Sequence, residues 1–428
     1  MKRLALLLVL ATALTLRGIN AVFLPLQEDE LIVSDMKGYD RAALALLRQE
    51  PLAVHTAEEY VFHPLGSDTY HPPGYYYFLA AVYGLFGHSY LTVRLVQALL
   101  DTLTCLLVYL IAENTFGAAA GFLAGSFVAL YPPLIFYTGV LLTETLTTCL
   151  LAAAVWLLLH IASQPPGRSR MSLALGGLLF GLASITRSIF LISVPFVLIW
   201  LTVLAQGWQG WSSSARRALW FLVPIALVIA PVTLRNWQIH GRFVPISTNG
   251  GVNFFLAHGG TQQEKDQVRN LPAVWSEGEI VGISPLTQPE EEALFYQLGW
   301  QHLRGHLLPT LRSLPGKLRS MYWISDYWPA TPAQLKILTA VDSVVWRIGI
   351  LPLAVLSLPF SRGQQQRRAL LLAFLVLSTM AIPLVFWAQP RFRIPIVPYF
   401  VVLAAGTVTL LYQRLAAQPT ERMETTAP

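Results

Sequence analysis

The feature that most constrains the fold is a series of apolar runs, each close to the length of a membrane crossing. About 20 apolar residues in a helix span the hydrocarbon core of a bilayer. The clearest runs are 4–26, 91–112, 118–137, 142–162, 173–187, 188–206, 218–234, 337–359, 369–388 and 394–412. A shorter stretch, 75–87, is typical of a re-entrant or interfacial segment. Together they predict an all-α, polytopic transmembrane helical bundle of about 10 or 11 membrane segments.

The composition excludes a water-soluble globular chain. Hydrophobic residues make up 54% of the sequence and charged residues 12%, with a mean hydropathy of +0.53. The surface area per unit mass falls too slowly with protein size for a soluble core to enclose that much apolar surface. The net charge of +6 comes mainly from basic residues in short loops and gives no indication of nucleic-acid binding. Cys105 and Cys149 lie inside apolar runs and offer neither a disulfide framework nor a CxxC metal motif.

The basic residues also predict the orientation of the chain. Lys2 and Arg3 place the N-terminus on the cytoplasmic side. Loops on the same side carry Arg168 with Arg170, Arg216 with Arg217, and Arg362 with Arg367 and Arg368. Segments 27–74 and 235–336 then lie outside, where loops on a rigid scaffold carry function. We expect a multi-pass membrane protein whose functional residues lie on the extracytoplasmic side.

The apolar runs divide the chain into six units. The first run ends without a small-residue cleavage site, so we interpret it as an uncleaved signal anchor. The expected units are a signal-anchor helix 1–26, a first outer loop 27–74, a transmembrane bundle 75–234, a second outer loop region 235–336, C-terminal transmembrane helices 337–412 and a cytoplasmic tail 413–428. Small residues at helix-packing spacing predict close helix contacts at Gly121 with Gly125 and at Gly177 with Gly181.

The first outer loop contains a pattern that predicts an amphipathic helix beginning at Asp35. Its apolar stripe comprises Met36, Tyr39, Ala43, Leu46 and Leu47, and its polar face comprises Lys37, Asp40, Arg41 and Arg48. Such a helix lies on the membrane surface rather than crossing it. The carboxylate of Asp35 is then held at the membrane–water boundary, either as a helix N-cap or as a functional group.

Two motifs in this region resemble those of a known class. Asp35, Tyr39 and Ala42 form an Asp-xxx-Tyr-xx-Ala pattern just after the first span, and Pro72-Pro73-Gly74-Tyr75 opens the next apolar segment. This arrangement is similar to the GT-C class of membrane glycosyltransferases. The bacterial branch akin to protein O-mannosyltransferases and lipid A aminoarabinose transferases is the most similar. The resemblance implies a GT-C type bundle in which Asp35 is the catalytic acid, with Asp40 as its nearest competitor.

Four later places extend the resemblance over most of the chain. They are Arg94 at the start of a span, Tyr131-Pro132-Pro133 followed by Leu141–Leu146 with Glu144, Arg235-Asn236-Trp237 followed by Ser247–Asn253, and Arg391-Phe392-Arg393-Ile394-Pro395. The 235–336 region is smaller than the large periplasmic domains of some relatives. This departure leaves recognition of the acceptor open.

Charged residues near the outer boundary predict an anion site. Glu144 lies in an apolar stretch, where a carboxylate is costly enough to indicate function, although a helix N-terminal charge is the alternative. Arg187, Arg235, Arg391 and Arg393 lie outside, against the positive-inside preference. Each of them could pair with an acid, but together they favour a phosphate site.

The implied activity is transfer of a sugar from a polyprenyl-phosphate donor to an envelope glycan, lipid or protein. Asp35 is expected to act as general base, with Glu144 as a partner that positions the acceptor or a metal. The expected substrate-binding residues are Tyr39, Arg94, Arg187, Arg235, Arg391 and Arg393, of which the last four would hold the lipid phosphate.

Metal dependence and two other functions stay open from the sequence. Relatives divide over the use of a divalent metal, HExxH is absent, and His71 and His258 are the candidate ligands. A transporter or lipid flippase would place charges near the midplane, where Asp101 is the one candidate acid. An O-antigen ligase or polymerase would place its chemistry in a large late loop rather than in an acidic first loop.

Overall fold

The protein is described by a computed structural model that is almost entirely helical. It describes residues 2–23, 35–53, 60–161, 170–205, 210–258, 287–323, 336, 339–340, 342, 344–387 and 389–416. The acids Glu28 and Glu30, Arg168 and tail residues 417–428 lie outside these ranges. Two two-residue strands, β1 (Leu52–Ala53) and β2 (Tyr60–Val61), pair antiparallel in the first outer loop. The predicted all-α class is therefore confirmed apart from this small hairpin.

Among the residues that the structure describes, six candidate spans are long and apolar enough to cross a membrane. They are α1 (Lys2–Phe23), α5 (Tyr90–Phe116), α8 (Glu144–Ile161), α11 (Trp211–His240), α18 (Gly363–Met380) continued by α19 (Ile382–Val385), and α20 (Val397–Ala416) preceded by η4 (Pro390–Ile396). Each coincides with a run read from the sequence. The multi-pass character of the chain follows from these helices.

The other apolar runs form bent or shorter helices. They are α6 (Ala118–Leu130) with α7 (Pro132–Thr138), α9 (Arg170–Thr186), η1 (Ser188–Ser193) with α10 (Val194–Ile199) and η2 (Trp200–Leu204), and η3 (Val345–Ile350) with α17 (Leu351–Phe360). Helix α4 (Gly74–Phe86) has 13 residues and matches the short segment expected there. Within the described residues, the predicted 10 or 11 segments therefore divide between these shorter helices and the longer candidate spans.

The bend between α6 and α7 has a local cause and a specific partner. The two helices meet at 55° beside Pro132 and Pro133, which interrupt regular helical hydrogen bonding. Arg17 of α1 donates to the carbonyl oxygens of Val128 and Ala129 at 3.1 and 2.9 Å. These carbonyls belong to the last turn of α6, whose acceptors otherwise lack helical donors. Arg17 thus links the C-terminal end of α6 to α1.

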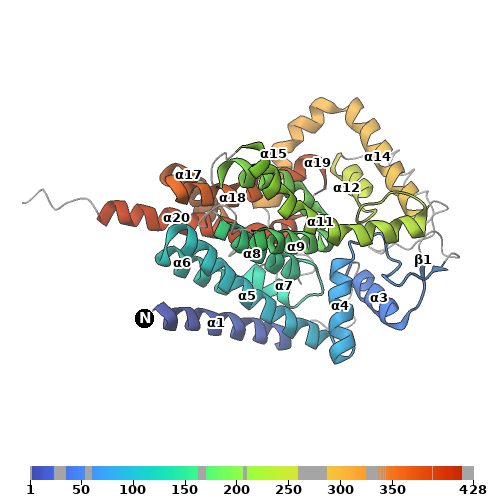
Figure 1. Ribbon diagram of the computed structural model, residues 1–428, viewed down its shortest axis with the longest axis horizontal. Helices are drawn as coiled ribbons and strands as arrows, with labels where there is room; N and C mark the ends of the chain where they lie inside the picture. The colour runs from blue at the N-terminus through green and yellow to red at the C-terminus, as the bar shows by residue number, and fades with distance from the viewer. Residues whose placement is uncertain are drawn as a thin grey trace, which may run out of the picture.

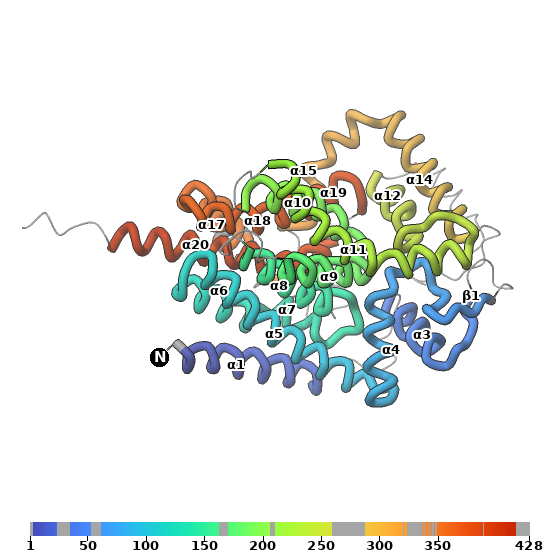
Figure 2. Tube along the Cα trace, viewed as in Figure 1, coloured from blue at the N-terminus to red at the C-terminus, as the bar shows by residue number. Residues whose placement is uncertain are grey.

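Asp101, the acid considered for a transport site, is the ion-pair partner of Arg17. The Nε atom of Arg17 lies 2.6 Å from Oδ2 of Asp101, and both side chains are buried. The pair joins α1 to α5, which also lie alongside each other in Figure 2. Its contacts are therefore internal to the bundle.

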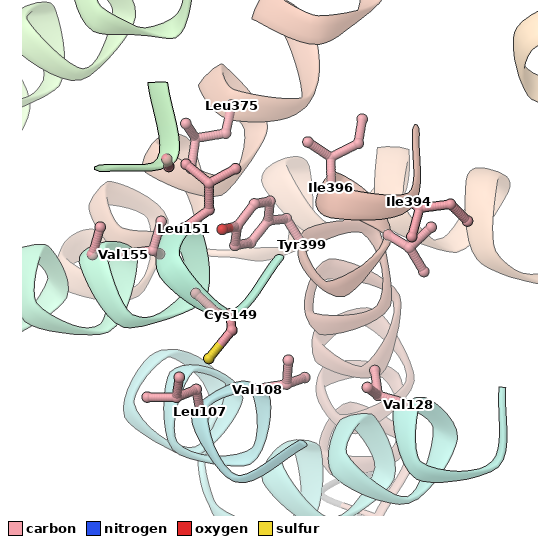
Figure 3. Packing of buried hydrophobic residues seen from close by; sticks show 14 of the residues in the cluster. Leu107, Val108, Val128, Cys149, Leu151, Val155, Leu375, Ile394, Ile396 and Tyr399 are labelled. Carbon is pink, nitrogen blue, oxygen red and sulfur yellow. The ribbon is translucent and has the colours of Figure 1, made fainter. Parts of the chain in front are cut away.

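The hydrophobic core lies where α5, α8 and α20 meet. Leu107 and Val108 of α5, Cys149 and Leu151 of α8 and Tyr399 of α20 pack together there (Figure 3). Both cysteines are free and buried, as the sequence predicts.

The predicted glycine contacts are also present. Gly177 and Gly181 of α9 face α11, and Gly121 and Gly125 of α6 face α5. Small residues allow these backbones to approach closely.

The two outer regions of the sequence gather at one end of the bundle. The N-terminus and the C-terminal end of α20 lie at the opposite end (Figure 1). The gathered elements are α3 (Asp35–Arg48), α4, the hairpin, α12 (Gly250–His258) and α14 (Gln288–Gly305), and α15 (Leu307–Trp323) leads from α14 back toward η4. Val252 and Phe255 of α12, Phe295 of α14 and Tyr70 form a small second core between the two regions.

The amphipathic helix expected from Asp35 is α3, with two corrections to its faces. Met36, Tyr39 and Ala43 are buried as predicted, but Leu47 is 44% exposed. Asp40 is buried and accepts hydrogen bonds from the hydroxyls of Tyr83 and Tyr90, at 2.7 and 3.2 Å. His88 contacts the same carboxylate at 3.0 Å. The predicted polar face of α3 is wrong at Asp40 because α4 and the start of α5 cover it, and this position leaves Asp40 outside the candidate site.

Candidate active site

A cavity of about 510 Å³ lies at this end of the bundle, where several segments distant in sequence converge. Its lining includes Asp35 and Tyr39 of α3, Tyr70 and His71 before α4, Arg187 before η1, Arg391 and Phe392 of η4, and Glu292 and Tyr296 of α14. The cavity has cationic groups at Arg187 and Arg391 and mostly apolar walls around them. Such a hollow with a few convergent polar groups is the usual form of a ligand site.

The central pair of the cavity is Asp35 with Arg391. The Nη2 atom of Arg391 donates to Oδ2 of Asp35 at 2.8 Å, and the Asp35 side chain is 33% exposed. Burial raises the pKa of Asp35, but Arg391 and His71 outweigh this effect and hold the pKa below its usual value. Asp35 is therefore ionised at neutral pH and faces the cavity.

A second ion pair, Asp68 with His71, supports the same wall. Nδ1 of His71 lies 2.8 Å from Oδ2 of Asp68, and the ring of His71 stacks 4.8 Å from that of Tyr39. Burial lowers the pKa of His71, but Asp68 reverses the direction and raises the pKa above its ordinary value. The Asp68 carboxylate thus favours the protonated form of an imidazole that lies beside Asp35.

Arg187 is held in place by Glu144 from outside the cavity. Its Nη1 atom donates to Oε1 of Glu144 at 2.8 Å and to the hydroxyl of Thr143 at 2.9 Å. Its guanidinium lies 4.5 Å from the ring of Phe392, whose other neighbour is Arg391 at 5.6 Å. Glu144 is fully buried and is absent from the cavity lining. The structure places Glu144 behind Arg187 rather than in reach of a substrate in the cavity.

Three other arginines expected at the site lie elsewhere among the described residues. Arg393 is buried, pairs with Asp342 and donates to the carbonyl of Met321 at 2.7 Å. Arg235 is buried and donates to Tyr76 and to the side-chain oxygen of Asn236. None of these residues lines the cavity.

Arg94 is the third of these arginines. Its Nη1 atom donates to the carbonyl of Ala21 at 3.5 Å, and the side chain is 7% exposed. It too is absent from the cavity lining. The structure therefore brings together Asp35, Tyr39, Arg187 and Arg391 of the expected set, with Glu144 in support.

The sequence reasoning missed three residues of this region. Asp68 lies three positions before His71, and this spacing in a loop entering a span could have indicated a pair. Glu292 and Tyr296 line the cavity from α14, in a region whose sequence shows no code for ligand recognition.

The carboxylates and histidines do not converge on a metal site. Within the part of the chain that the structure describes, no group of three or more His, Cys, Asp or Glu side chains could hold a metal ion. His258, one of the two candidate ligands, contacts the carbonyl of Val385 instead, at 3.1 Å.

An apolar groove adjoins the cavity. It has a volume of about 800 Å³ and lies between η1 with α10 and the middle of α11. Leu191 lines both the groove and the cavity, on the side of the cavity where Arg187 lies. The cationic end of the cavity is thus next to a surface suited to a hydrocarbon chain.

Comparisons with known proteins agree with this arrangement. The sequence model of the dolichyl-phosphate-mannose-protein mannosyltransferase family matches residues 70–234. No curated protein is significantly similar to the chain in sequence.

Solved structures resemble nearly the whole chain. The oligosaccharyltransferase AglB from Archaeoglobus fulgidus, in complex with an inhibitory peptide and a dolichol-phosphate, superposes with a TM-score of 0.60 at 15% identity over 96% of this chain and 50% of that one. The same enzyme tethered to an acceptor peptide gives a TM-score of 0.57 at 14% identity, with 96% and 50% coverage. Apo ArnT from Cupriavidus metallidurans gives 0.54 at 15% identity, covering 94% of this chain and 59% of that one.

The bundle and its end-on cavity therefore define a polytopic membrane protein with the GT-C glycosyltransferase fold. The resemblance to the branch of protein O-mannosyltransferases and aminoarabinose transferases is confirmed. The chain spans about half the length of the oligosaccharyltransferase and 59% of the length of ArnT.

Proposed function

We propose that the protein is an integral membrane glycosyltransferase that moves a sugar from a polyprenyl-phosphate carrier to an acceptor outside the cytoplasm. The acceptor is a glycan, lipid or protein of the envelope. The Asp35–Arg391 pair carries the proposal, because a carboxylate and a guanidinium face one cavity there, with Arg187 beside them. A sugar-lipid needs such a polar cavity and also a place for its tail, for which the adjoining apolar groove is suited.

The proposed reaction is a single displacement at the anomeric carbon. The acceptor oxygen forms a bond to this carbon while the bond to the phosphate oxygen breaks, and the phosphate leaves with the electron pair. Asp35 takes the proton from the acceptor hydroxyl. The lowered pKa makes Asp35 a weak base. It still suffices, because the hydroxyl becomes strongly acidic once its oxygen bonds to carbon.

Arg391 and Arg187 act on the leaving group in this proposal. Guanidinium groups match phosphate geometry and offset the charge that develops on it. Both guanidiniums also contact the ring of Phe392, at 4.5 Å for Arg187 and 5.6 Å for Arg391. When the donor binds, Arg391 shares its donors between Asp35 and the phosphate, which frees a carboxylate oxygen for the acceptor.

Glu144 serves as a positioning residue for Arg187, and Tyr39 packs under His71 at the same wall. Arg94, Arg235 and Arg393 are left out of the proposed phosphate site because they do not line the cavity. We further propose that the domain limits read from the sequence hold, with 27–74 and 235–336 outside a plasma (inner) membrane. In that orientation, Asp35 meets donors displayed on the outer leaflet.

The proposal is tested with the purified full chain in proteoliposomes and a panel of polyprenyl-phosphate hexoses and pentoses. We expect release of bare polyprenyl phosphate from at least one donor when envelope extract is supplied as the acceptor. Movement of the intact donor between leaflets without release would instead support a flippase. Release that depends on a polyprenyl diphosphate donor would support a ligase or polymerase.

A further inference from the structure

The outer wall of the cavity is built by two helices, α12 and α14, packed backbone against backbone. A Cβ atom at Gly251 would clash with the carbonyl of Glu292, and one at Gly250 with the hydroxyl of Tyr296. Glycine at both positions therefore permits the close approach. The contact places the side chains of Glu292 and Tyr296 beside the first turn of α12, in the lining of the cavity.

Contacts at both ends fix this wall to the rest of the site. The hydroxyl of Thr69 contacts His240 at 2.7 Å and donates to the side-chain oxygen of Gln288 at the start of α14. The backbone N–H of Trp387 donates to the carbonyl of Asn253 on α12, at 2.8 Å. The wall is thus joined to the loop that carries His71 and to the segment that precedes Arg391.

Glu292 is a carboxylate that the proposed transfer chemistry does not use. Among the described residues it forms no ion pair with a cation, although it lies partly buried in the cavity wall. Burial raises the pKa of Glu292 to about 7, against hydrogen bonds from the backbone N–H groups of Gly250 and Gly251, which lower it. Burying a carboxylate without a cation is costly, and such groups in clefts are candidates for ligand contacts.

The lining around Glu292 indicates the ligand chemistry. Ser247, Asn249, Asn253 and the hydroxyl of Tyr296 supply neutral polar groups, and Trp387 supplies an aromatic face. The cavity's arginines, Arg187 and Arg391, belong instead to the wall formed by η4 and the start of η1. A carboxylate with amides and aromatic rings, and without cations, suits a ligand rich in hydroxyl groups rather than a phosphate.

We propose that Glu292, with Tyr296 beside it, forms a carbohydrate subsite opposite the phosphate-binding wall and selects sugars by their hydroxyl pattern. This inference rests on the proposed function. The carboxylate has lone pairs beyond those that accept from Gly250 and Gly251, and these accept hydrogen bonds from ring hydroxyls. A sugar lacking such a hydroxyl leaves that hydrogen bond unmade. Sites built to pair with a hydroxyl discriminate strongly against analogues without it. The ring belongs either to the transferred sugar or to the acceptor.

The test is equilibrium binding to the purified full chain in detergent. The variants are Glu292→Gln, which keeps the shape but removes the charge, and Glu291→Gln, which makes the same change one position away and off the cavity lining. The ligands are a short-chain polyprenyl-phosphate hexose, the same polyprenyl phosphate without sugar, and a methyl hexoside alone. The bare polyprenyl phosphate is the matched control ligand, because its binding depends on the wall that carries Arg187 and Arg391.

We expect Glu292→Gln to weaken binding of a sugar-bearing ligand by about 10- to 100-fold, the value of one or two hydrogen bonds to a charged group. Binding of the bare phosphate and the behaviour of Glu291→Gln stay unchanged. Loss confined to the polyprenyl-phosphate hexose assigns the subsite to the transferred sugar, and loss confined to the methyl hexoside assigns it to the acceptor.

Two outcomes overturn the inference. Unchanged binding of both sugar-bearing ligands would remove Glu292 from recognition. Equal loss for the bare phosphate would show that Glu292 only holds α12 and α14 together. Binding is measured without turnover, so its result is independent of the release assay. If the chain binds sugars through Glu292 but releases no lipid phosphate, only the proposed function is contradicted.

Discussion

Arg391 donates a 2.8 Å hydrogen bond to Asp35 across 356 positions of sequence. Asp35 begins α3, the next helix that the structure describes after the N-terminal span, and Arg391 lies in η4 at the entry to α20. The pair therefore joins α3 to η4 and also lies at the centre of the cavity. Neutralising either residue alters both the charge of the site and a contact between α3 and η4.

Replacing Asp35 by Asn removes the proposed base while keeping its shape. We expect transfer to fall by about 100- to 10,000-fold, the usual contribution of a general base. Release of bare polyprenyl phosphate measures the effect. A variant that keeps wild-type release would exclude Asp35 from the chemistry.

The matched control for Asp35 is Asp40→Asn on the same helix. Asp40 accepts hydrogen bonds from Tyr83 and Tyr90 away from the cavity, so its loss should lower the melting temperature while donor binding persists in the folded fraction. If Asp35→Asn and Asp40→Asn lose transfer equally when equal amounts of folded protein are compared, the different roles given to the two acids are wrong.

Arg391→Lys and Arg393→Lys should separate a ligand contact from a structural contact. Lysine keeps the charge but loses the planar donor set. We expect Arg391→Lys to weaken donor binding by about 10-fold or more with a near-normal melting temperature. Arg393→Lys should instead destabilise the fold by about 1–3 kcal/mol, because a lysine cannot keep both the contact with buried Asp342 and the hydrogen bond to the carbonyl of Met321. Thermal unfolding and binding of bare polyprenyl phosphate distinguish the two, and a reversed pattern would contradict the assignment.

Glu144→Gln and Arg187→Gln should act on the same contact. If Glu144 works only by holding Arg187, the double variant should bind donor no more weakly than Arg187→Gln alone. A double-mutant cycle on donor affinity gives the coupling. Fully additive losses would indicate that Glu144 contacts the substrate independently.

The Asp68–His71 pair predicts a pH dependence of stability. Because the pKa of His71 is raised in the folded state, the stability that its pairing contributes is fully present below the unfolded pKa of 6.5. This stability is lost as pH rises through the folded pKa. Because the pKa of Asp68 is lowered in the folded state, the stability that this carboxylate contributes is present above its unfolded pKa of 3.8. This stability is lost as pH falls through the folded pKa. The melting temperature of wild type should therefore exceed that of His71→Gln most between about pH 4 and 6.5. A difference that grows with alkaline pH would contradict the pairing.

The sequence predicted the parts of the fold that depend on local pattern. Apolar runs of about 20 residues became the long helices, although the run 118–137 was read as one segment and is bent at Pro132 and Pro133. The amphipathic pattern placed α3 correctly at Asp35. The faces of α3 could not be read in full, because the cover over Asp40 comes from residues more than 40 positions away.

The site was predicted only in part for a similar reason. Arg391 and Arg393 looked equivalent in sequence, but they lie in a 3₁₀ turn, where side chains two positions apart point in different directions. Arg391 faces the cavity and Arg393 faces Asp342. Glu292 had no signal of its own, since its place in the cavity depends on the packing of α14 against α12.

The close contact of α12 with α14 has a consequence for how such a protein can diversify. At Gly251 the approach of the two helices is limited by the main-chain carbonyl of Glu292, an atom that any residue at position 292 supplies. Substitutions at Glu292 or Tyr296 can therefore change the ligand-facing chemistry without shifting the scaffold. Related chains could acquire new sugar preferences through one or two point changes at these positions, while the arginine-bearing wall stays the same.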